Sequence, residues 1–282
     1  MVVGVSCGGT QHADHNGGAS TAASPATTSA NGHPAAPGDH HEHSGRGVTD
    51  VQDGYHLALL GAPTAAGGPG GLSFRITGPT GAAQTRFQLE QERLMHVYVV
   101  RADLTDFYHI HPDMAPDGTW SVPLTLSRPG PYHVVTEFVA LDEQNQPHHL
   151  MLGANVVLPG QYSPEQLPGP SQETNVDGYT VRVEGTPVAD QATMLTLKIT
   201  KGGAPVTDIE PYLGVYAHLT AFHEGDLQAV HIHPHNEPSG NQGSPPELMV
   251  HTEFPAAGLY RMFIQFQTGG QLHTAAITVQ AQ

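Results

Sequence analysis

The tetrapeptide His-Ile-His-Pro occurs twice in this chain, at residues 109–112 and 231–234. When the two halves are aligned on it, His96 falls on His218, and each lies thirteen positions before the first histidine of its tetrapeptide. Self-similarity of this kind indicates an internal duplication. We therefore expect the same fold to be built twice, with a matching set of histidines in each copy.

Both copies consist of short β-prone runs separated by turn signals. Runs such as LMHVYVV, PYHVVTEFV and GLYRMFIQF alternate with the turn sequences GPTG, PDG and RPG. The alignment also matches Tyr132 with Tyr260, and a glycine stands two positions before each tyrosine. No segment keeps a helical apolar period beyond two turns. The sequence thus predicts an all-β protein, with an antiparallel sandwich or small barrel in each copy.

Changes in composition divide the chain into four parts. The first part is nearly free of large apolar side chains and cannot offset the entropy of ordering, while the third is rich in proline and polar residues. The predicted parts are a disordered, histidine-containing N-terminal segment (1–50), a first β-sandwich repeat (51–158), a proline-rich linker (159–176) and a second β-sandwich repeat (177–282).

The N-terminal sequence MVVGVSCGG resembles the end of a bacterial lipoprotein signal, in which an apolar run and a small residue precede a cysteine that becomes lipidated. The apolar run is too short for a complete signal, so we expect the true start upstream. Cys7 is the single cysteine, which leaves no intramolecular disulfide and no cysteine-based zinc site. A blue-copper centre is excluded too, as long as Cys7 lies outside the core. The prediction is a lipid-anchored, extracytoplasmic protein whose only membrane contact is its anchor.

The formal net charge is −16, from 26 Asp plus Glu against ten Lys plus Arg. Nucleic-acid-binding proteins carry the opposite balance, so the charge argues against that class. An acidic protein attracts cations, although acidity also serves solubility. The charge is therefore compatible with a metal ion as partner.

Alternation along a β-strand places the two histidines of each tetrapeptide on one face. His109 and His111 therefore point the same way, and the segment that begins at His96 reads as strand, polar turn and strand. If this hairpin closes around residues 102–105, an odd register brings His96 to the face of the other two rings, and an even register turns it away. The sequence leaves the register open.

Three imidazoles on one face suit Cu(II) or Zn(II), which take nitrogen ligands at ~2.0–2.1 Å. We expect copper, with zinc as the alternative. The predicted metal ligands are His96, His109 and His111 in the first copy, and His218, His231, His233 and His251 in the second. Weaker candidates are His133 and Met114 in the first copy, His235 and Glu237 in the second, and His40, His41 and His43 in the N-terminal segment.

The second copy contains in order EPYLG (210–214), His218, HIHP, HTEF (251–254) and FQTGG. This series is similar to that of a family of bacterial secreted and lipoprotein β-sandwich proteins, in which EPYLG, GH, HVHP, HTxF and FQxGG follow one another. Ala217 stands where that family usually has glycine. The first copy looks like the companion domain of actinobacterial members, so the resemblance covers most of residues 51–282. It implies two tandem immunoglobulin-like or cupredoxin-like sandwiches outside the cytoplasm and an association with copper or heavy-metal handling, without an established activity.

Three functions are compatible with these residues. The first is a non-catalytic metal-binding lipoprotein, acting as scavenger, buffer or chaperone, with a possible protein partner in metal transfer. The second is a cupin-like metalloenzyme, because HIHPHNEPSGNQG resembles the first cupin metal motif and GPYH, which ends at His133, resembles the second. Neither copy carries both halves of that pattern. The third is a protein-interaction module in which the histidines are incidental. Metal uptake without turnover would favour the first function.

Overall fold

The computed structural model of the protein describes residues 46–236, 238 and 243–282, apart from the side chain of His233. Every regular element in these residues is a β-strand, and neighbouring strands pair antiparallel. The predicted all-β fold with two tandem repeats is thus confirmed. None of the described residues forms a helix that is long and apolar enough to cross a membrane.

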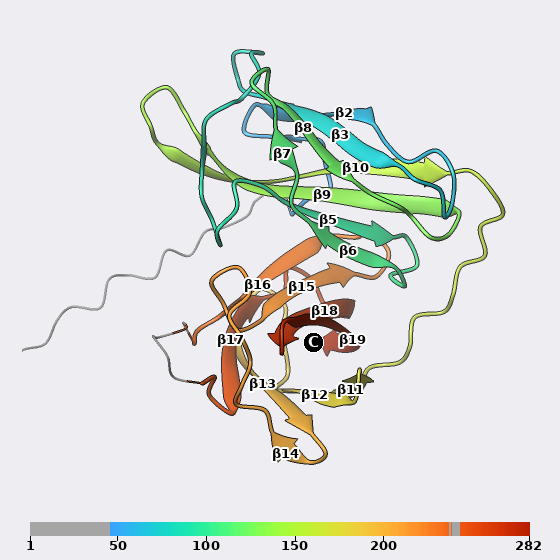
Figure 1. Ribbon diagram of the computed structural model, residues 1–282, viewed down its shortest axis with the longest axis vertical. Helices are drawn as coiled ribbons and strands as arrows, with labels where there is room; N and C mark the ends of the chain where they lie inside the picture. Colours follow the sequence, from blue (N-terminus) through green and yellow to red (C-terminus); the bar gives the residue numbers. More distant parts are fainter. Residues whose placement is uncertain (1–45, 237, 239–242) are drawn as a thin grey trace, which may run out of the picture. The chain divides into compact units, whose positions relative to one another are not determined.

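The first repeat is a sandwich of two sheets. One sheet has the strand order β1-β2-β3-β8-β7, and the other has the order β10-β9-β5-β6, with β4 paired to β9. The strands are β1 (Val51–Gln52), β2 (Tyr55–Gly61), β3 (Gly71–Thr77), β4 (Phe87–Gln88), β5 (His96–Arg101), β6 (Phe107–Ile110), β7 (Asp113–Met114), β8 (Thr119–Pro123), β9 (Gly130–Leu141) and β10 (Pro147–Leu158). Figure 1 shows β9 and β10 as a long hairpin beside β5.

Alternation of apolar residues builds the core of the first repeat. Leu72, Phe74 and Ile76 of β3 are buried, while the residues between them are more exposed. Across the sandwich they share one apolar core with Val97 and Val99 of β5. Each such side chain contributes about 1.5–3 kcal/mol when it is removed from water. Buried and more exposed residues alternate with a period of two, which is the period of side chains along a β-strand, so these segments form strands.

Strand β5 is buried on both of its faces. Val97 and Val99 point into the core of the first repeat, whereas Tyr98 and Val100 belong to another apolar cluster that includes Phe263 of the second repeat. Side chains two positions apart in a strand share a face. His96 therefore lies on the face of β5 that packs against the second repeat.

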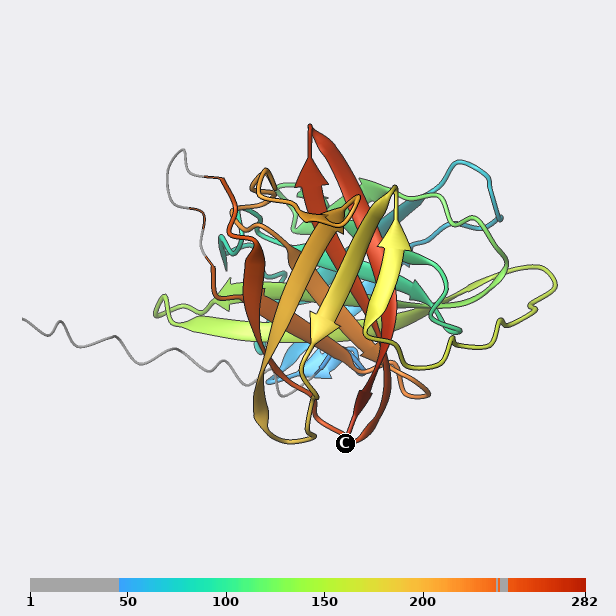
Figure 2. The same cartoon turned by 90° about the horizontal axis from the view of Figure 1, so that it is seen from below.

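The second repeat forms a continuous sheet with the order β11-β12-β13-β17-β16-β15-β18-β19, and β14 pairs with β13. The strands are β11 (Glu173–Val176), β12 (Tyr179–Glu184), β13 (Ala192–Lys201), β14 (Ala204–Pro205), β15 (His218–His223), β16 (Ala229–Pro234), β17 (Glu247–Glu253), β18 (Gly258–Thr268) and β19 (Gln271–Ala281). Figure 2 shows its yellow strands β11 and β12 in front of its red strands β18 and β19. The backbone N–H of Ser171 donates to the carbonyl of Thr278 at 3.0 Å, so the two ends of the sheet approach each other. The sheet thereby encloses one core.

The two tyrosines matched in the sequence occupy equivalent places in the two repeats. The Tyr132 hydroxyl donates to the carbonyl of Arg128 at 2.8 Å, and the Tyr260 hydroxyl donates to that of Ala256 at 3.0 Å. A tyrosine that bonds the backbone just upstream of its strand is typical of immunoglobulin-like sandwiches. Gly130 has a φ of 125°, and a Cβ there would overlap a neighbouring tyrosine ring, so glycine is required.

The linker expected at residues 159–176 differs in one respect from an unstructured connection. Its last four residues form β11, which pairs with β12 from Val176↔Tyr179 to Glu173↔Arg182. The first strand of the second repeat therefore begins inside the proline-rich segment.

Candidate metal centre

The register of β5 against β6 places three histidines of the first repeat on one face. Val97 pairs with Ile110 and Tyr98 pairs with His109. This register puts His96 opposite His111, which directly follows β6, so both rings lie on the face of His109. It is the odd register, which the sequence left open.

The three rings converge on one point. His96 Nδ1 lies 3.1 Å from His109 Nε2, and His111 Nε2 lies 3.2 Å from each of these two nitrogens. Zinc and copper bind imidazole nitrogen at ~2.0–2.1 Å, so an ion that contacts all three atoms would lie about 1 Å from their plane. Among the described residues, these three form the group of potential ligands close enough to share one ion.

The outer ring nitrogens of two of these histidines face oxygen atoms. His96 Nε2 lies 3.0 Å from the carbonyl oxygen of Glu90, and His109 Nδ1 lies 2.7 Å from Gln265 Oε1. An oxygen acceptor requires the proton on the nitrogen that faces it. The neutral rings then present lone pairs at their inner nitrogens, as metal-ligating histidines do when a second group bonds the far side of the ring.

Burial keeps these imidazoles neutral. It is the largest cause that lowers the pKa of His96, lowers the pKa of His109 well below its ordinary value, and lowers the pKa of His111 to about 3. The neighbouring histidines lower the pKa values of His109 and His111 further, whereas the Glu137 carboxylate partly opposes the lowering for His96. Because only neutral imidazole binds metal ions, this environment favours ligation.

The second repeat reproduces part of this arrangement. Leu219 pairs with Ile232 as Val97 pairs with Ile110, and His218 Nε2 lies 2.8 Å from the carbonyl oxygen of Tyr212. His218 is buried, and its Nδ1 atom has no hydrogen-bond partner within the part of the chain that the structure describes. The His218 ring also approaches the first-repeat cluster. Its centroid lies 5.6 Å from that of His109 and 6.5 Å from that of His96.

His231 is held differently from its counterpart His109. Its Nδ1 atom lies 2.7 Å from Glu137 Oε1, and its Nε2 atom lies 3.5 Å from Gln91 Nε2. The backbone of β16 places His233 opposite His251 of β17, and the His251 ring lies 6.2 Å from the ring of His235. The side chain of His233 and all of Glu237 lie outside the described residues, as do Cys7, His40, His41 and His43.

The weaker candidates of the first repeat lie apart from the triad. Both ring nitrogens of His133 face oxygen atoms, Asn155 Oδ1 at 2.8 Å and the carbonyl oxygen of Gly47 at 2.6 Å. Met114 pairs with Trp120 and packs against the apolar core. The His133 ring is therefore occupied by protein acceptors, and the two halves of the cupin-like pattern do not meet in this repeat.

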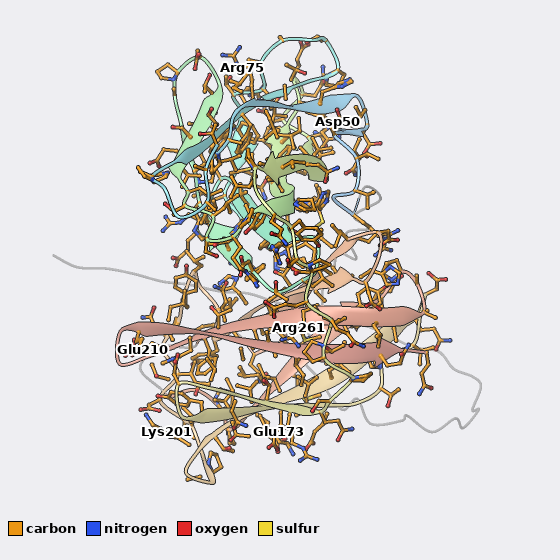
Figure 3. The ribbon with its side chains drawn as sticks, turned by 90° about the vertical axis from the view of Figure 1, so that its right-hand side faces the viewer. Asp50, Arg75, Glu173, Lys201, Glu210 and Arg261 are labelled. Atoms are coloured by element: carbon orange, nitrogen blue, oxygen red, sulfur yellow. The ribbon has the colours of Figure 1, made fainter. Side chains whose placement is uncertain are left out.

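Arg261 of the second repeat follows Tyr260 as His133 follows Tyr132. Its Nη1 atom donates to Thr278 Oγ1 at 3.0 Å on the neighbouring strand β19, and Figure 3 labels this side chain on the ribbon of β18. This position therefore supplies no metal ligand in the second repeat.

Sequence reasoning missed the groups behind the histidines. Gln265 and Glu137 are nearly completely buried, and each bonds a histidine of the other repeat. The signal was present, because both are polar residues inside the apolar runs PYHVVTEFV and GLYRMFIQF, five positions after the matched tyrosines. A polar residue inside a buried run needs a partner, which alignment of the repeats alone does not name.

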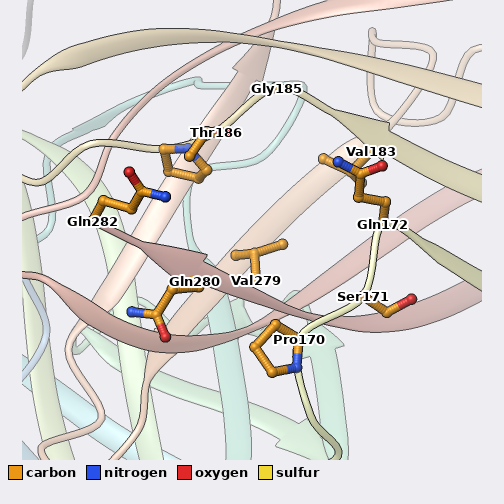
Figure 4. Close-up of a pocket in the computed structure, with 10 residues that line it drawn as sticks. Pro170, Ser171, Gln172, Val183, Gly185, Thr186, Val279, Gln280 and Gln282 are labelled. Atoms are coloured by element: carbon orange, nitrogen blue, oxygen red, sulfur yellow. The ribbon is translucent and has the colours of Figure 1, made fainter.

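Two surface pockets lie away from the histidine triad. One, of about 390 Å³, is lined by residues that include Asp53, Asp142 and His148. The other, of about 250 Å³, lies between the linker residues 170–172 and the C-terminal strand β19 (Figure 4). The candidate metal centre is thus formed by converging side chains and not by either pocket.

Comparison with protein families gave one match. A family model described as "Domain of unknown function (DUF8832)" matches residues 49–152 and again residues 174–282. The match falls on both repeats, so the duplication is a tandem pair of one type of domain. No curated protein matches the chain.

Comparison with solved structures gave weak similarities. The Escherichia coli adhesin FdeC is 15% identical, with a TM-score of 0.26, over 82% of this chain and 65% of that chain. Domains 4 and 5 of the S-layer protein SbsC are 13% identical, with a TM-score of 0.23, over 80% of this chain and 97% of that chain. Invasin, a bacterial integrin-binding protein, is 12% identical, with a TM-score of 0.22, over 80% of this chain and 39% of that chain. This chain therefore spans about two-thirds of FdeC's matched chain and less of invasin's.

Proposed function

The chain belongs to the DUF8832 family, with two copies of its domain in tandem, and we propose that it binds a transition-metal ion through His96, His109 and His111. Copper is the proposed ion, and zinc is the alternative. The observation that carries this proposal is the meeting of three imidazole nitrogens at 3.1–3.2 Å from one another.

The protonation of the cluster favours an ion over a hydrogen-bonded structural role. A hydrogen bond between two ring nitrogens needs a proton on one of them. The protons of His96 and His109 are held at the outer nitrogens by the Glu90 carbonyl and Gln265, which leaves two inner lone pairs facing each other. A neutral His111 with its proton on Nε2 can donate to one of these lone pairs, at 3.2 Å, but burial opposes the second proton that the other lone pair would need. A cation bound by the inner nitrogens removes the conflict.

The nature of the ligands favours copper over zinc. The ligand atoms are all imidazole nitrogens, and at a site of this kind Cu(II) binds more tightly than Zn(II). His111 is only partly buried, so the side of the site next to it can admit a further ligand from solvent. The site therefore suits reversible loading, as expected of a scavenger, buffer or chaperone that passes its ion to a protein partner.

The proposed location is outside the cytoplasm, on a lipid anchor at Cys7. This part of the proposal rests on the lipoprotein-like start of the sequence and on the resemblance of the histidine motifs to secreted bacterial proteins. The excess of acidic side chains would help to concentrate cations near such a protein.

Calorimetric titration of the full chain with Cu(II) and with Zn(II) tests the proposal. The decisive variant is His111→Ala, because His111 is only partly buried and directly follows β6, so its removal leaves the paired strand residues in place. We expect sub-micromolar binding by the parent protein, with copper tighter than zinc, and loss of at least tenfold in affinity in the variant. A variant in which His40, His41 and His43 are replaced by alanine distinguishes metal binding by the N-terminal segment from binding at the proposed site.

His223→Ala is the matched control, because His223 bonds Asp226 at 2.7 Å and is not a proposed ligand. It should bind copper as the parent does. Equal affinity of the parent and His111→Ala would overturn the proposed site. Absence of saturable binding by the parent would leave the protein-interaction module as the better explanation.

A further inference from the structure

Each repeat supplies a polar side chain that bonds a histidine of the other repeat. His109 Nδ1 of the first repeat lies 2.7 Å from Gln265 Oε1 of the second. His231 Nδ1 of the second repeat lies 2.7 Å from Glu137 Oε1 of the first. The exchange is reciprocal, because His109 and His231 are the first histidines of the two His-Ile-His-Pro tetrapeptides.

The two polar side chains occupy equivalent positions. Glu137 is the cross-strand partner of His96 between β5 and β9, and Gln265 is the cross-strand partner of His218 between β15 and β18. One repeat therefore supplies a carboxylate and the other a neutral amide at the same place. In the metal site proposed for the first repeat, the amide of Gln265 bonds the ligand His109.

The orientation of the Gln265 amide is determined by its surroundings. Its Nε2 atom donates to Thr274 Oγ1 of β19 at 3.3 Å, which directs Oε1 toward His109. The side chain is buried, so water cannot readily replace the bond to the ring. An acceptor in this place keeps the proton on His109 Nδ1 and the lone pair on Nε2, which faces His96 and His111.

On the basis of the proposed metal site, we infer that Gln265 is a positioning residue of that site, supplied by the second repeat. We further infer that its neutral amide favours a singly charged ion more than a carboxylate would. Groups that bond the far side of a metal-ligating histidine typically contribute 10–100-fold to metal affinity, so the first-repeat site is incomplete without the second repeat.

The preference for charge follows from electrostatics. A carboxylate on the far side of the His109 ring would lie roughly 6 Å from the ion, and at that distance a full negative charge attracts a divalent ion twice as strongly as a monovalent one. The amide adds no such charge. Compared with a carboxylate at the same position, the amide therefore shifts the ratio of Cu(II) to Cu(I) affinity toward Cu(I).

Two substitutions of Gln265 separate its hydrogen bond from its charge. Gln265→Leu removes the acceptor at similar size, and Gln265→Glu keeps an acceptor and introduces the carboxylate found at Glu137. Affinities of the full chain for Zn(II), Cu(II) and Cu(I) would be measured by competition with chelators, together with the Cu(II)/Cu(I) reduction potential. Gln267→Leu on the same strand is the control, because Gln267 bonds Glu210 at 2.9 Å and bonds no histidine among the described residues.

We expect Gln265→Leu to weaken Zn(II) and Cu(II) binding about 10–100-fold and Gln267→Leu to leave it unchanged. Gln265→Glu should keep the Zn(II) binding that Gln265→Leu loses. It should also shift the ratio of Cu(II) to Cu(I) affinity toward Cu(II) by about tenfold or more, with a lower reduction potential. That shift is measurable even if the leucine variant folds poorly, and a packing role alone would not produce it.

The outcomes distinguish this inference from the function on which it rests. If His111→Ala loses metal and Gln265→Leu binds as the parent does, the positioning role is wrong and the metal site stands. If Gln265→Glu leaves the ratio of Cu(II) to Cu(I) affinity unchanged, the charge argument is wrong. If the parent itself binds no ion, the proposed function fails and this inference fails with it.

Discussion

Glu137 of the first repeat and His231 of the second form a buried ion pair, with Oε1 and Nδ1 2.7 Å apart and side chains 1% and 2% exposed. The Tyr98 hydroxyl donates to the other carboxylate oxygen at 2.8 Å. Burial by itself would lower the pKa of His231, but the charge and the hydrogen bond of Glu137 outweigh it, so the pKa is raised. The pair thus links the two repeats through a charge-assisted bond.

Glu137→Ala should destabilise the protein strongly, because it leaves His231 and Tyr98 without this carboxylate in a buried place. Removing one partner of a buried ion pair costs about 3–5 kcal/mol in the free energy of unfolding. Glu137→Gln keeps an acceptor and should cost less, about 1–2 kcal/mol. Urea unfolding measures both. Glu173→Ala is the control, since its 3.6 Å pair with Arg182 is exposed and contributes about 0–1 kcal/mol. If Glu137→Ala lowered the free energy of unfolding by less than about 1 kcal/mol, instead of the expected ~3–5 kcal/mol, the role of this pair would be contradicted.

Phe263→Ala should weaken the packing between the repeats. The rings of Phe107 and Phe263 stack with centroids 4.2 Å apart and planes 7° apart, inside the apolar cluster that also contains Tyr98. Loss of a buried phenylalanine costs about 3–5 kcal/mol, because the transfer energy is lost and a cavity is left. Val157→Ala, at a side chain that is 71% exposed, should change the free energy of unfolding by less than about 0.5 kcal/mol. Equal unfolding midpoints for the two variants would refute the contribution of the cluster.

Tyr260→Phe should cost about 1–2 kcal/mol of stability, because it removes one hydroxyl and leaves the Ala256 carbonyl without its donor. The Tyr260 hydroxyl donates to that carbonyl at 3.0 Å and accepts from the Ala256 N–H at 3.2 Å. Thermal unfolding would report the loss as a lower Tm. Tyr162→Phe, at a partly exposed ring, should leave the Tm almost unchanged. A Tm for Tyr260→Phe that equals that of the parent would show that this bond does not stabilise the second repeat.

The metal-free protein should lose stability as the pH falls from 7 to 5.5. The pKa values of His96, His109, His111 and His218 are lowered in the folded state, chiefly by burial, from an ordinary value of 6.5. Below that value the unfolded chain binds more protons than the folded one, so stability decreases with decreasing pH. The midpoint of urea unfolding, measured with a chelator present, should therefore be lower at pH 5.5 than at pH 7.

Glu90 works in the opposite direction. Burial and the charge of Glu137 raise its pKa from 4.5 to about 7, so over that range the folded state binds the extra proton and gains stability as the pH falls. The pKa of His231 is also raised, so between pH 7 and about 6 this residue acts in the same direction as Glu90. Four histidines with lowered pKa values oppose these two groups, so we expect a net loss of stability. His111→Gln should flatten the profile, and a midpoint that rises toward pH 5.5 would rule out this account.

Parts of the candidate site followed from the sequence. The spacing of His96, His109 and His111, repeated in the second half, selected the three side chains that converge in the first repeat. The same reasoning kept His133 as a weaker candidate, and its ring is bonded to Asn155 and Gly47. Spacing along a strand reports which side chains share a face, and it does not report which protein acceptors already occupy a ring.

The all-β class, the internal duplication and the sets of paired histidines were determined by the sequence itself, because alternation and spacing along a strand are local properties. Only the tertiary structure decided the register that brings His96 to the other two rings, and the bond from His109 to Gln265, which lies 156 positions away. The physical reason is that both depend on packing. Tyr98 and Val100 are drawn into the apolar cluster between the repeats, and the face of β5 that they share carries His96 to the same side.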